Sequence, residues 1–300
     1  MGRNMRVEHP VTVRFYEPPE DLAQFFTSFY CAEIQPAGSG PVADRLHPEW
    51  AGLRIFSGAK PSSRISDQPM LSDADVVVTG PSSVPLHFSI GTTRFWCVGF
   101  LPLGWATFVG QPANRFANTV NNARSTSAFS HFVPLAEKLL NEGTCGEGTD
   151  PAAPFPIMEN FFRNEAPRFG NGEPRIQAIH AAMIEPELPT VSQMAERCGV
   201  HPRTLERLCL RHFGFSPKLL LRRQRFMRSL SRFMLDPSLG WAGAIDSLYV
   251  DQSHFVRDCH DFLGMPPSAY AALDHPILTA FMRERKRVLG SPVQTLDPPR

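Results

Sequence analysis

Residues 201–220, HPRTLERLCLRHFGFSPKLL, decide the fold of the C-terminal part of this chain, because a similar stretch, DQSHFVRDCHDFLGMPPSAY, recurs at 251–270. At an offset of fifty residues, four positions are identical: Arg207 and Arg257, Cys209 and Cys259, Gly214 and Gly264, and Pro217 and Pro267. Apolar residues also coincide, as Leu205 does with Phe255, whereas the polar residues between them mostly differ. A shared apolar frame with divergent polar positions indicates one structural unit used twice, facing two different surfaces.

The length and composition are those of an ordinary globular protein. The 300 residues are enough for two domains, each with its own core. The hydrophobic fraction is 42% and the charged fraction 20%, both typical of soluble domains. No apolar run reaches the ~20 residues needed to span a bilayer, and the N-terminus lacks the apolar segment of a secretory signal. We therefore expect a cytoplasmic protein with no membrane contact.

The cysteines indicate neither disulfides nor a metal site. They lie far apart and none forms a C-x-x-C pair, so we expect no disulfide framework and no zinc site. Their mostly apolar neighbours favour buried free thiols over a redox sensor. The cysteines are Cys31, Cys97, Cys145, Cys198, Cys209 and Cys259. We expect neither a bound metal nor another cofactor.

The first 125 residues predict a β-rich domain. Short, β-branched or aromatic segments at 11–16, 53–56, 75–80 and 87–105 are separated by Gly, Pro and Ser clusters, a pattern typical of a sandwich or barrel. Residues 21–30 fit a helix or a strand equally well. Helices are expected at 131–143 and about 156–164. The remaining segments, 142–156 and 168–175, predict loops, and we place the domain boundary near 170.

Residues 190–214 predict a helix-turn-helix unit. Thr190 or Ser192 can cap its first helix, small Ala195 lets a second helix cross closely, and Gly199 tolerates the positive φ of a sharp turn. Leu205 then faces inward. The second copy places Trp241, Ile245 and Leu248 on the inner face of a first helix and runs its second helix from about Asp251 to Phe262. A helix over 217–235 joins the copies; about 18 residues span roughly 27 Å, near the ~34 Å between major grooves on one face of DNA.

These residues carry a resemblance to the AraC/XylS-type transcription regulators. It covers roughly 174–273 and implies a DNA-binding domain over 171–275, with helix-turn-helix units at about 190–213 and 240–263 and a C-terminal tail over 276–300. Two residues depart from the family pattern: Gly243 replaces a branched apolar residue and Leu248 replaces a glycine. The matching positions are Ala195, Gly199, Leu205, Arg207, Phe213 to Pro217, Arg225, Asp251 to Phe255, Arg257, Gly264 and Pro267.

A looser resemblance concerns residues 80–119, GPSSVPLHFSIGTTRFWCVGFLPLGWATFVGQPANRFANT, which are similar to the cupin-like N-terminal region of some family members. It implies a β-rich, cupin-like barrel or sandwich over 1–170 that binds a small-molecule effector, dimerises, or both. Four aromatic residues either line an apolar pocket there or form core, and core is the favoured interpretation. They are Phe95, Trp96, Phe100 and Trp105.

The stretch from Arg197 to Arg232 is strongly basic, with ten Lys or Arg residues and the single acid Glu206. On a DNA-reading motif, such a run predicts phosphate contacts. The resemblance implies that the exposed faces of the two second helices read bases. For Arg207 and Arg257, the alternative is that they support the motif by bonding to the backbone. Arg225 is expected to form an internal ion pair. The base-reading candidates are Arg203, Glu206, Arg207, Gln252, Ser253, Val256 and Arg257. The phosphate candidates are Arg222, Arg228 and Arg232.

The sequence therefore predicts a bacterial, nucleoid-associated regulator whose partner is double-stranded DNA. A homodimer is expected, as is RNA polymerase as a partner if the protein activates. One alternative is an effector-independent DNA binder whose N-terminal domain only dimerises. The remote alternative, a cupin-type enzyme, lacks support, since no two of the ten histidines form H-x-H and no nucleophile elbow, P-loop or dinucleotide motif occurs.

Overall fold

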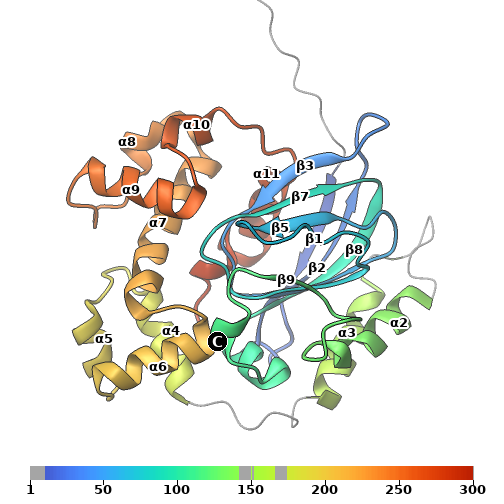
Figure 1. Cartoon of the computed structure of the whole chain (residues 1–300), viewed down its shortest axis with the longest axis horizontal. Coiled ribbons are helices and arrows are strands. Elements are labelled where there is room, and N and C mark those ends of the chain that lie inside the picture. Colours follow the sequence, from blue (N-terminus) through green and yellow to red (C-terminus); the bar gives the residue numbers. More distant parts are fainter. Residues whose placement is uncertain (1–10, 142–149, 151, 166–173, 300) are drawn as a thin grey trace, which may run out of the picture.

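The computed structural model describes residues 11–141, 150, 152–165 and 174–299. Figure 1 shows a β-sheet domain beside an arm of helices, and the last helix, α11 (Leu278–Leu289), returns from the arm to the sheets. This two-domain architecture, β-rich and then all-helical, confirms the predicted fold class. The predicted loop at 142–156 lies partly, and the predicted boundary near 170 wholly, outside the described residues. No helix of the described residues is long and apolar enough to cross a membrane.

Two antiparallel sheets form the first domain. The larger has the order β1 (Val11–Tyr16), β2 (Phe26–Ile34), β8 (Thr93–Phe100), β4 (Gly52–Phe56), β6 (Val76–Thr79) and β9 (Val120–Asn122). The smaller has the order β3 (Val42–Leu46), β7 (Leu86–Ile90) and β5 (Ser62–Ile65). The ambiguous stretch at 21–30 is a turn followed by the start of β2, which pairs with β8 from Ile34–Thr93 to Phe26–Phe100. The sequence patterns missed β2, β3, β5 and β9.

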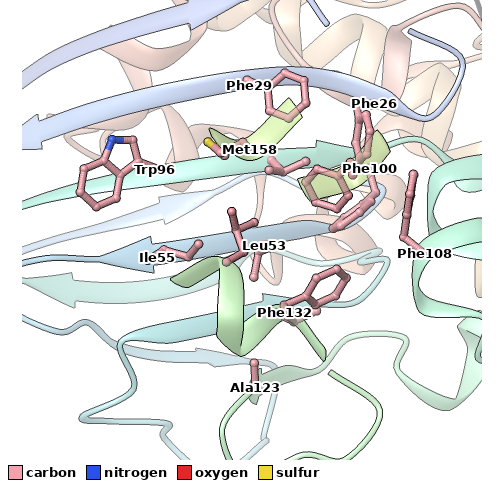
Figure 2. Packing of buried hydrophobic residues seen from close by; sticks show 14 of the residues in the cluster. Phe26, Phe29, Leu53, Ile55, Trp96, Phe100, Phe108, Ala123, Phe132 and Met158 are labelled. Carbon is pink, nitrogen blue, oxygen red and sulfur yellow. The ribbon is translucent and has the colours of Figure 1, made fainter. Parts of the chain in front are cut away.

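One face of the larger sheet carries a core of aromatic residues under helices (Figure 2). The covering elements are a π-helical turn (Trp105–Val109), α2 (Val133–Asn141) and α3 (Pro154–Glu165). The short α1 (Pro102–Gly104), just before the π-helical turn, packs against the helical arm through Leu103. Phe162 of α3 packs against Phe26, with ring centroids 4.6 Å apart. The other face of this sheet turns toward the smaller sheet, and the residues between them form a second core.

The helical arm contains the repeated units. Its helices are α4 (Pro174–Ile184), α5 (Val191–Arg197), α6 (Pro202–Phe213), α7 (Pro217–Leu235), α8 (Gly240–Ala244), α9 (Gln252–Leu263) and α10 (Pro267–Ala271). Thr190, rather than Ser192, caps α5 and forms a capping box with Gln193. Asp251 caps α9 by accepting a hydrogen bond from the backbone N–H of His254 at 2.9 Å. In Figure 1, α7 stands between α5 and α6 at one end and α8, α9 and α10 at the other.

The two units turn by different means. Gly199 has φ +61°, the left-handed conformation predicted for the first turn. In the second unit, the prediction that the first helix reaches Leu248 is wrong, because α8 ends at Ala244. Asp246 makes the turn instead: its carboxylate accepts a hydrogen bond from the backbone N–H of Leu248 at 3.0 Å. A short polar side chain thus replaces the glycine that the family pattern would place there.

Candidate nucleic-acid interface

The long helix α7 separates two helix-turn-helix units, which we call the first head (α5 and α6) and the second head (α8 and α9). Its 19 residues correspond to a length of about 28 Å. Its buried side includes Leu220, Phe226, Met227 and Leu230, each 0% exposed. These side chains pack into the cores of the two heads, so α7 fixes the distance between them.

In the first head, α6 has one buried and one exposed face. Leu205 and Cys209 are 0% exposed and face the core. Arg203, Glu206 and Arg207 are exposed on the other side. An exposed helix face with two arginines and one carboxylate presents donors for guanine and an acceptor for the cytosine amino group.

In the second head, α9 repeats this arrangement. Phe255 is 1% exposed and lies in the core, whereas Gln252, Ser253 and Arg257 are exposed and Val256 is half-buried. The Arg257 Nε donates to the backbone carbonyl of Ser253 at 3.4 Å, a long contact within the same helix. All seven base-reading candidates therefore lie on the two predicted reading helices, six of them exposed.

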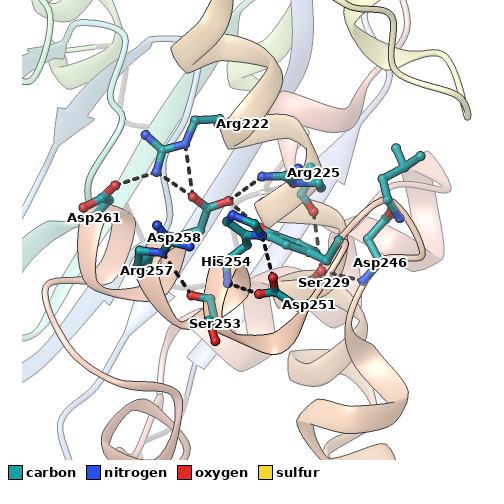
Figure 3. A network of polar contacts seen from close by, with 12 residues as sticks. Arg222, Arg225, Ser229, Asp246, Asp251, Ser253, His254, Arg257, Asp258 and Asp261 are labelled. Atoms are coloured by element: carbon teal, nitrogen blue, oxygen red, sulfur yellow. Dashed lines mark hydrogen bonds and ion pairs between the residues drawn. The ribbon is translucent and has the colours of Figure 1, made fainter.

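The three phosphate candidates have different surroundings. Arg222 forms ion pairs with Asp258 at 2.6 Å and Asp261 at 2.5 Å (Figure 3). Arg228 donates to the backbone carbonyls at the end of α4, including that of Pro186 at 2.6 Å. Arg232 is exposed. Arg222 and Arg228 thus have partners inside the arm, because carboxylates and a helix C-terminus lie within their reach, and phosphate contact by either residue stays a prediction.

Asp258 is the centre of a buried polar network that sequence reasoning missed. Its side chain is 3% exposed and forms ion pairs with Arg222 and Arg225, the latter at 3.1 Å. The Tyr249 hydroxyl donates to the same carboxylate at 2.7 Å, and the Arg225 guanidinium lies 4.1 Å from the centre of the Tyr249 ring. The internal ion pair predicted for Arg225 is thus present, and the network joins α7 to α9.

Arg223 is a buried cation at the junction between the two domains. It is 0% exposed, donates to the backbone carbonyl of Ser82 at 2.7 Å, and lies 4.3 Å from the centre of the Trp50 ring. Burial lowers the pKa of Arg223 to about 9. Arg223 therefore joins α7 to the sheet domain through Ser82 and Trp50, and its guanidinium also lies 5.9 Å from the centre of the Phe215 ring in the arm.

Each head also meets the sheet domain at a buried histidine. On the side of the first head, His180 packs edge-on against Trp50, with ring centroids 5.4 Å apart. On the side of the second head, His47 lies 2.6 Å from the Tyr270 hydroxyl. Burial lowers the pKa of each imidazole to about 3. For His180, a hydrogen bond with the backbone of Asp297 opposes this effect and the guanidinium of Arg223 adds to it.

A narrow cavity of about 40 Å³ lies between the two sheets. Its walls are almost entirely apolar, although Arg54, Ser63 and Thr79 are among the lining residues. The Arg54 guanidinium forms an ion pair with Glu49 at 2.8 Å. Phe95 lines this cavity. The idea that Trp96, Phe100 and Trp105 share a pocket with Phe95 is wrong, because these three belong to the core on the opposite face of the sheet. Neighbouring strand residues point to opposite faces.

Among the residues that the structure describes, no group of three or more His, Cys, Asp or Glu is placed to hold a metal ion. The thiols of Cys31, Cys97, Cys209 and Cys259 are buried, and that of Cys198 is half-buried. Burial raises the pKa of Cys209 and of Cys259 to about 12. Cys145 lies outside the described part of the chain.

Comparisons with known proteins agree with the helical arm. Residues 194–272 match the model of a helix-turn-helix domain family. ToxT from Vibrio cholerae strain SCE256, solved with an unsaturated fatty acid bound, is 9% identical, with 90% of this chain and 97% of that chain covered and a TM-score of 0.41. The AraC-like transcriptional activator CuxR is 11% identical, with coverages of 73% and 86% and a TM-score of 0.26. No curated protein matches the chain.

The matched residues run from α5 to just beyond α10 and include both reading helices. Two helix-turn-helix units on one connecting helix are the arrangement that the AraC resemblance implies. Residues 194–272 of this chain therefore form a helix-turn-helix domain, with the two-unit arrangement that the AraC resemblance implies.

Proposed function

We propose that this chain is an AraC-type transcription regulator that reads a specific duplex sequence with both heads. A small-molecule effector bound in the sheet domain controls its DNA occupancy. The observation that carries the reading is the pair of exposed helix faces at the two ends of α7. On these faces, α6 offers Arg203, Glu206 and Arg207, and α9 offers Gln252, Ser253 and Arg257. Arginine pairs with guanine and glutamine with adenine through two hydrogen bonds each.

Phosphate contacts set the register of such a complex without adding base preference. Arg232 is the phosphate candidate that keeps an exposed side chain, and Lys218 and Arg211 are exposed as well. Apart from the proposed base readers Arg203 and Arg207, the other basic residues of the 197–232 stretch are held by partners within the protein. Arg197, for example, forms an ion pair with Glu185. The electrostatic footprint is accordingly smaller than the count of positive charges suggests.

Effector control is supported by the interior of the sheet domain. The cavity between the sheets is apolar and adjoins a buried arginine, a combination typical of small-molecule sites. The domain is also joined to both heads, through His180 and Trp50 on one side and through His47 and Tyr270 on the other. A ligand that favours one arrangement of these contacts would change DNA affinity by its differential affinity for the two states.

Two further aspects stay proposals of the same kind. A homodimer would place four heads on a longer operator, and RNA polymerase would be a partner if the protein activates. The alternative, that the sheet domain only dimerises and binds no effector, is favoured by the small volume of the cavity. It predicts that no small molecule changes DNA binding.

Selection of duplex sequences from a random library, followed by mapping of chromosomal occupancy in the host, tests the reading. We expect one preferred site with two separated half-sites, and occupancy near a small set of genes. Thermal-shift screening of the substrates and products of the enzymes encoded near those genes tests effector control. Uniform recovery of all library sequences at low salt would contradict sequence-specific reading.

A further inference from the structure

We propose that α11 is a removable plug: its Phe281 occupies the space between the sheets that an effector would take, so that effector and helix compete for the same site. This inference rests on the proposed function in taking the sheet domain as the effector site. It concerns the tail over 276–300, for which the sequence left open whether it is disordered or packs back. In Figure 1, α11 lies beside the strands, and its Leu278 and Met282 also pack in the core of the second head.

The Phe281 side chain is enclosed by rings of the sheet domain. It is 7% exposed. Its ring lies 5.6 Å from Tyr30, 6.2 Å from Phe15 and 6.3 Å from Phe95, measured between centroids, and is stacked on Phe95 with an interplanar angle of 10°. Ile277, one helical turn before it, is 1% exposed in the same core. The end of the polypeptide thus supplies part of the interior of the first domain.

Phe281 lies in the wall of two small cavities rather than one large one. The cavity between the sheets measures about 40 Å³, and a second one, beneath the segment 47–49, measures about 70 Å³. Tyr30, Leu46, Arg54 and Phe281 line both. Small-molecule sites usually measure ~300–1,000 Å³, so neither cavity admits a drug-sized molecule while α11 is in place. Withdrawal of the Phe281 ring would join them.

A clasp of polar groups on and after β3 holds the plug. Asp44, which is 7% exposed, accepts hydrogen bonds from the backbone N–H groups of Ile277 at 2.7 Å and Leu278 at 2.8 Å. This carboxylate from the first domain therefore satisfies donors at the start of α11. Glu49 accepts from the side-chain amide of Gln294 at 2.9 Å. These contacts hold the start of α11 and the 3-10 turn Gln294–Leu296 that follows it, and they are hydrogen bonds that can break and re-form.

The plug is also connected to the second head. Residues 272–277 are the whole connection between α10 and α11. Tyr270 of α10 is 2% exposed, packs in the core of the second head, and contacts His47 in the clasp. Trp241 of the same head donates to the backbone carbonyl of Pro267 at 3.0 Å. Release of α11 would therefore loosen the contact that fixes the second head to the sheet domain.

The test uses the full chain and the probe 1-anilinonaphthalene-8-sulfonate. This anion has a large aromatic body, and its fluorescence increases when that body is buried in an apolar site. Phe281→Ala should bind one equivalent at least tenfold more tightly than the unaltered chain, because the two cavities become one. Phe162→Ala is the matched control: it removes the same ring from the first domain, but from the other face of the sheet. It should bind the probe like the unaltered chain. Phe281→Leu, a milder change, should lie between them.

Hydrogen exchange supplies the second measurement. In the unaltered chain, saturating probe should speed exchange of the α11 amides at least tenfold while the strands stay protected. The plug is overturned if Phe281→Ala and Phe281→Leu both bind no more tightly than Phe162→Ala, or if α11 keeps its protection with the probe bound. If α11 is released but DNA affinity is the same with and without probe, the plug stands and effector control of DNA binding fails.

Discussion

The two heads share the same buried apolar positions, but they differ in the contacts that hold the reading helix in place. At the offset of fifty residues, Leu208 and Gly199 of the first head correspond to Asp258 and Tyr249 of the second. Leu208 is a buried apolar side chain, and Gly199 makes the turn with a positive φ. In the second head, the Tyr249 hydroxyl instead donates to a buried carboxylate, which also holds two arginines of α7. The apolar side chain of Leu208 is thus replaced, at the matched position, by the carboxylate of Asp258 and its polar network.

This difference shows which parts of a repeated motif are needed for its fold. The inward positions Leu205 and Phe255, with Cys209 and Cys259, are apolar in both heads. The residue at the matched positions 208 and 258 can be apolar or charged, provided that a charged side chain has ion-pair or hydrogen-bond partners. A polar closure concentrates its stability in one residue, because removal of a shared carboxylate leaves several groups unsatisfied. The second head should therefore be the more sensitive of the two to a single substitution.

The largest effect is expected from Asp258→Ala. The change removes the carboxylate that pairs with two arginines of α7 and accepts a hydrogen bond from Tyr249. Because these groups lose their partner, the free energy of unfolding of the second head should fall by about 3–5 kcal/mol. Urea unfolding, with hydrogen exchange to locate the loss in α9, measures it. Asp261→Ala is the control, since Asp261 pairs with the same Arg222 but its side chain is 53% exposed; it should cost at most about 1 kcal/mol. Equal losses in the two variants would contradict the comparison.

The contacts between the heads and the sheet domain should weaken in acid. His47 and His180 are each neutral when buried, with a pKa of about 3, against about 6.5 in the unfolded chain. Unfolding therefore takes up protons below pH 6.5, and the stability present above that pH is lost as the pH falls toward 3. At pH 5 the expected loss is about 2 kcal/mol for each histidine.

Unfolding by urea at pH 7.5, 6 and 5 measures this dependence. In His47→Gln, the loss between pH 7.5 and pH 5 should shrink by the share of one histidine, and hydrogen exchange should show that the remaining acid sensitivity lies at the first head. In His180→Gln, the sensitivity should remain at the second head. A pH profile that neither substitution changes would show that the buried imidazoles are not its cause.

The heads were predictable from the sequence because their information is local and repeated. Capping by Thr190, the turn at Gly199 and the buried Leu205 follow from spacing alone, and the second copy supports the first. What the sequence could not reveal depends on partners far along the chain. Arg222 belongs to the most basic stretch, and only the fold brings Asp258 within reach of it. In the same way, nothing local indicates that Phe281, from a basic tail, enters a sheet domain.

Base preference should separate the two heads next. At the matched positions 203 and 253, the first head has an arginine and the second a serine. Arg203→Ala should therefore relax preference at one position of the first half-site and cost ~1–3 kcal/mol there, leaving the second half-site unchanged. Competition between duplexes that differ at single positions measures this. Arg211→Ala, an exposed residue in the last turn of the same helix, should leave every preference intact. If Arg203→Ala leaves the site preference intact as well, Arg203 does not read a base.

The smallest expected effect is on DNA affinity and concerns the exposed arginine of α7, the helix between the heads. Arg232 is exposed, so Arg232→Ala should weaken binding to all duplexes alike and reduce the slope of log affinity against log salt by about 0.9. Arg222→Ala should lower the stability of the second head but leave that slope nearly unchanged, because its guanidinium is held by Asp258 and Asp261. Titrations at four salt concentrations, with unfolding of each variant in parallel, distinguish the two roles. A flatter salt dependence in Arg222→Ala, without a loss of stability, would return Arg222 to the phosphate contacts that the charge of the sequence predicts.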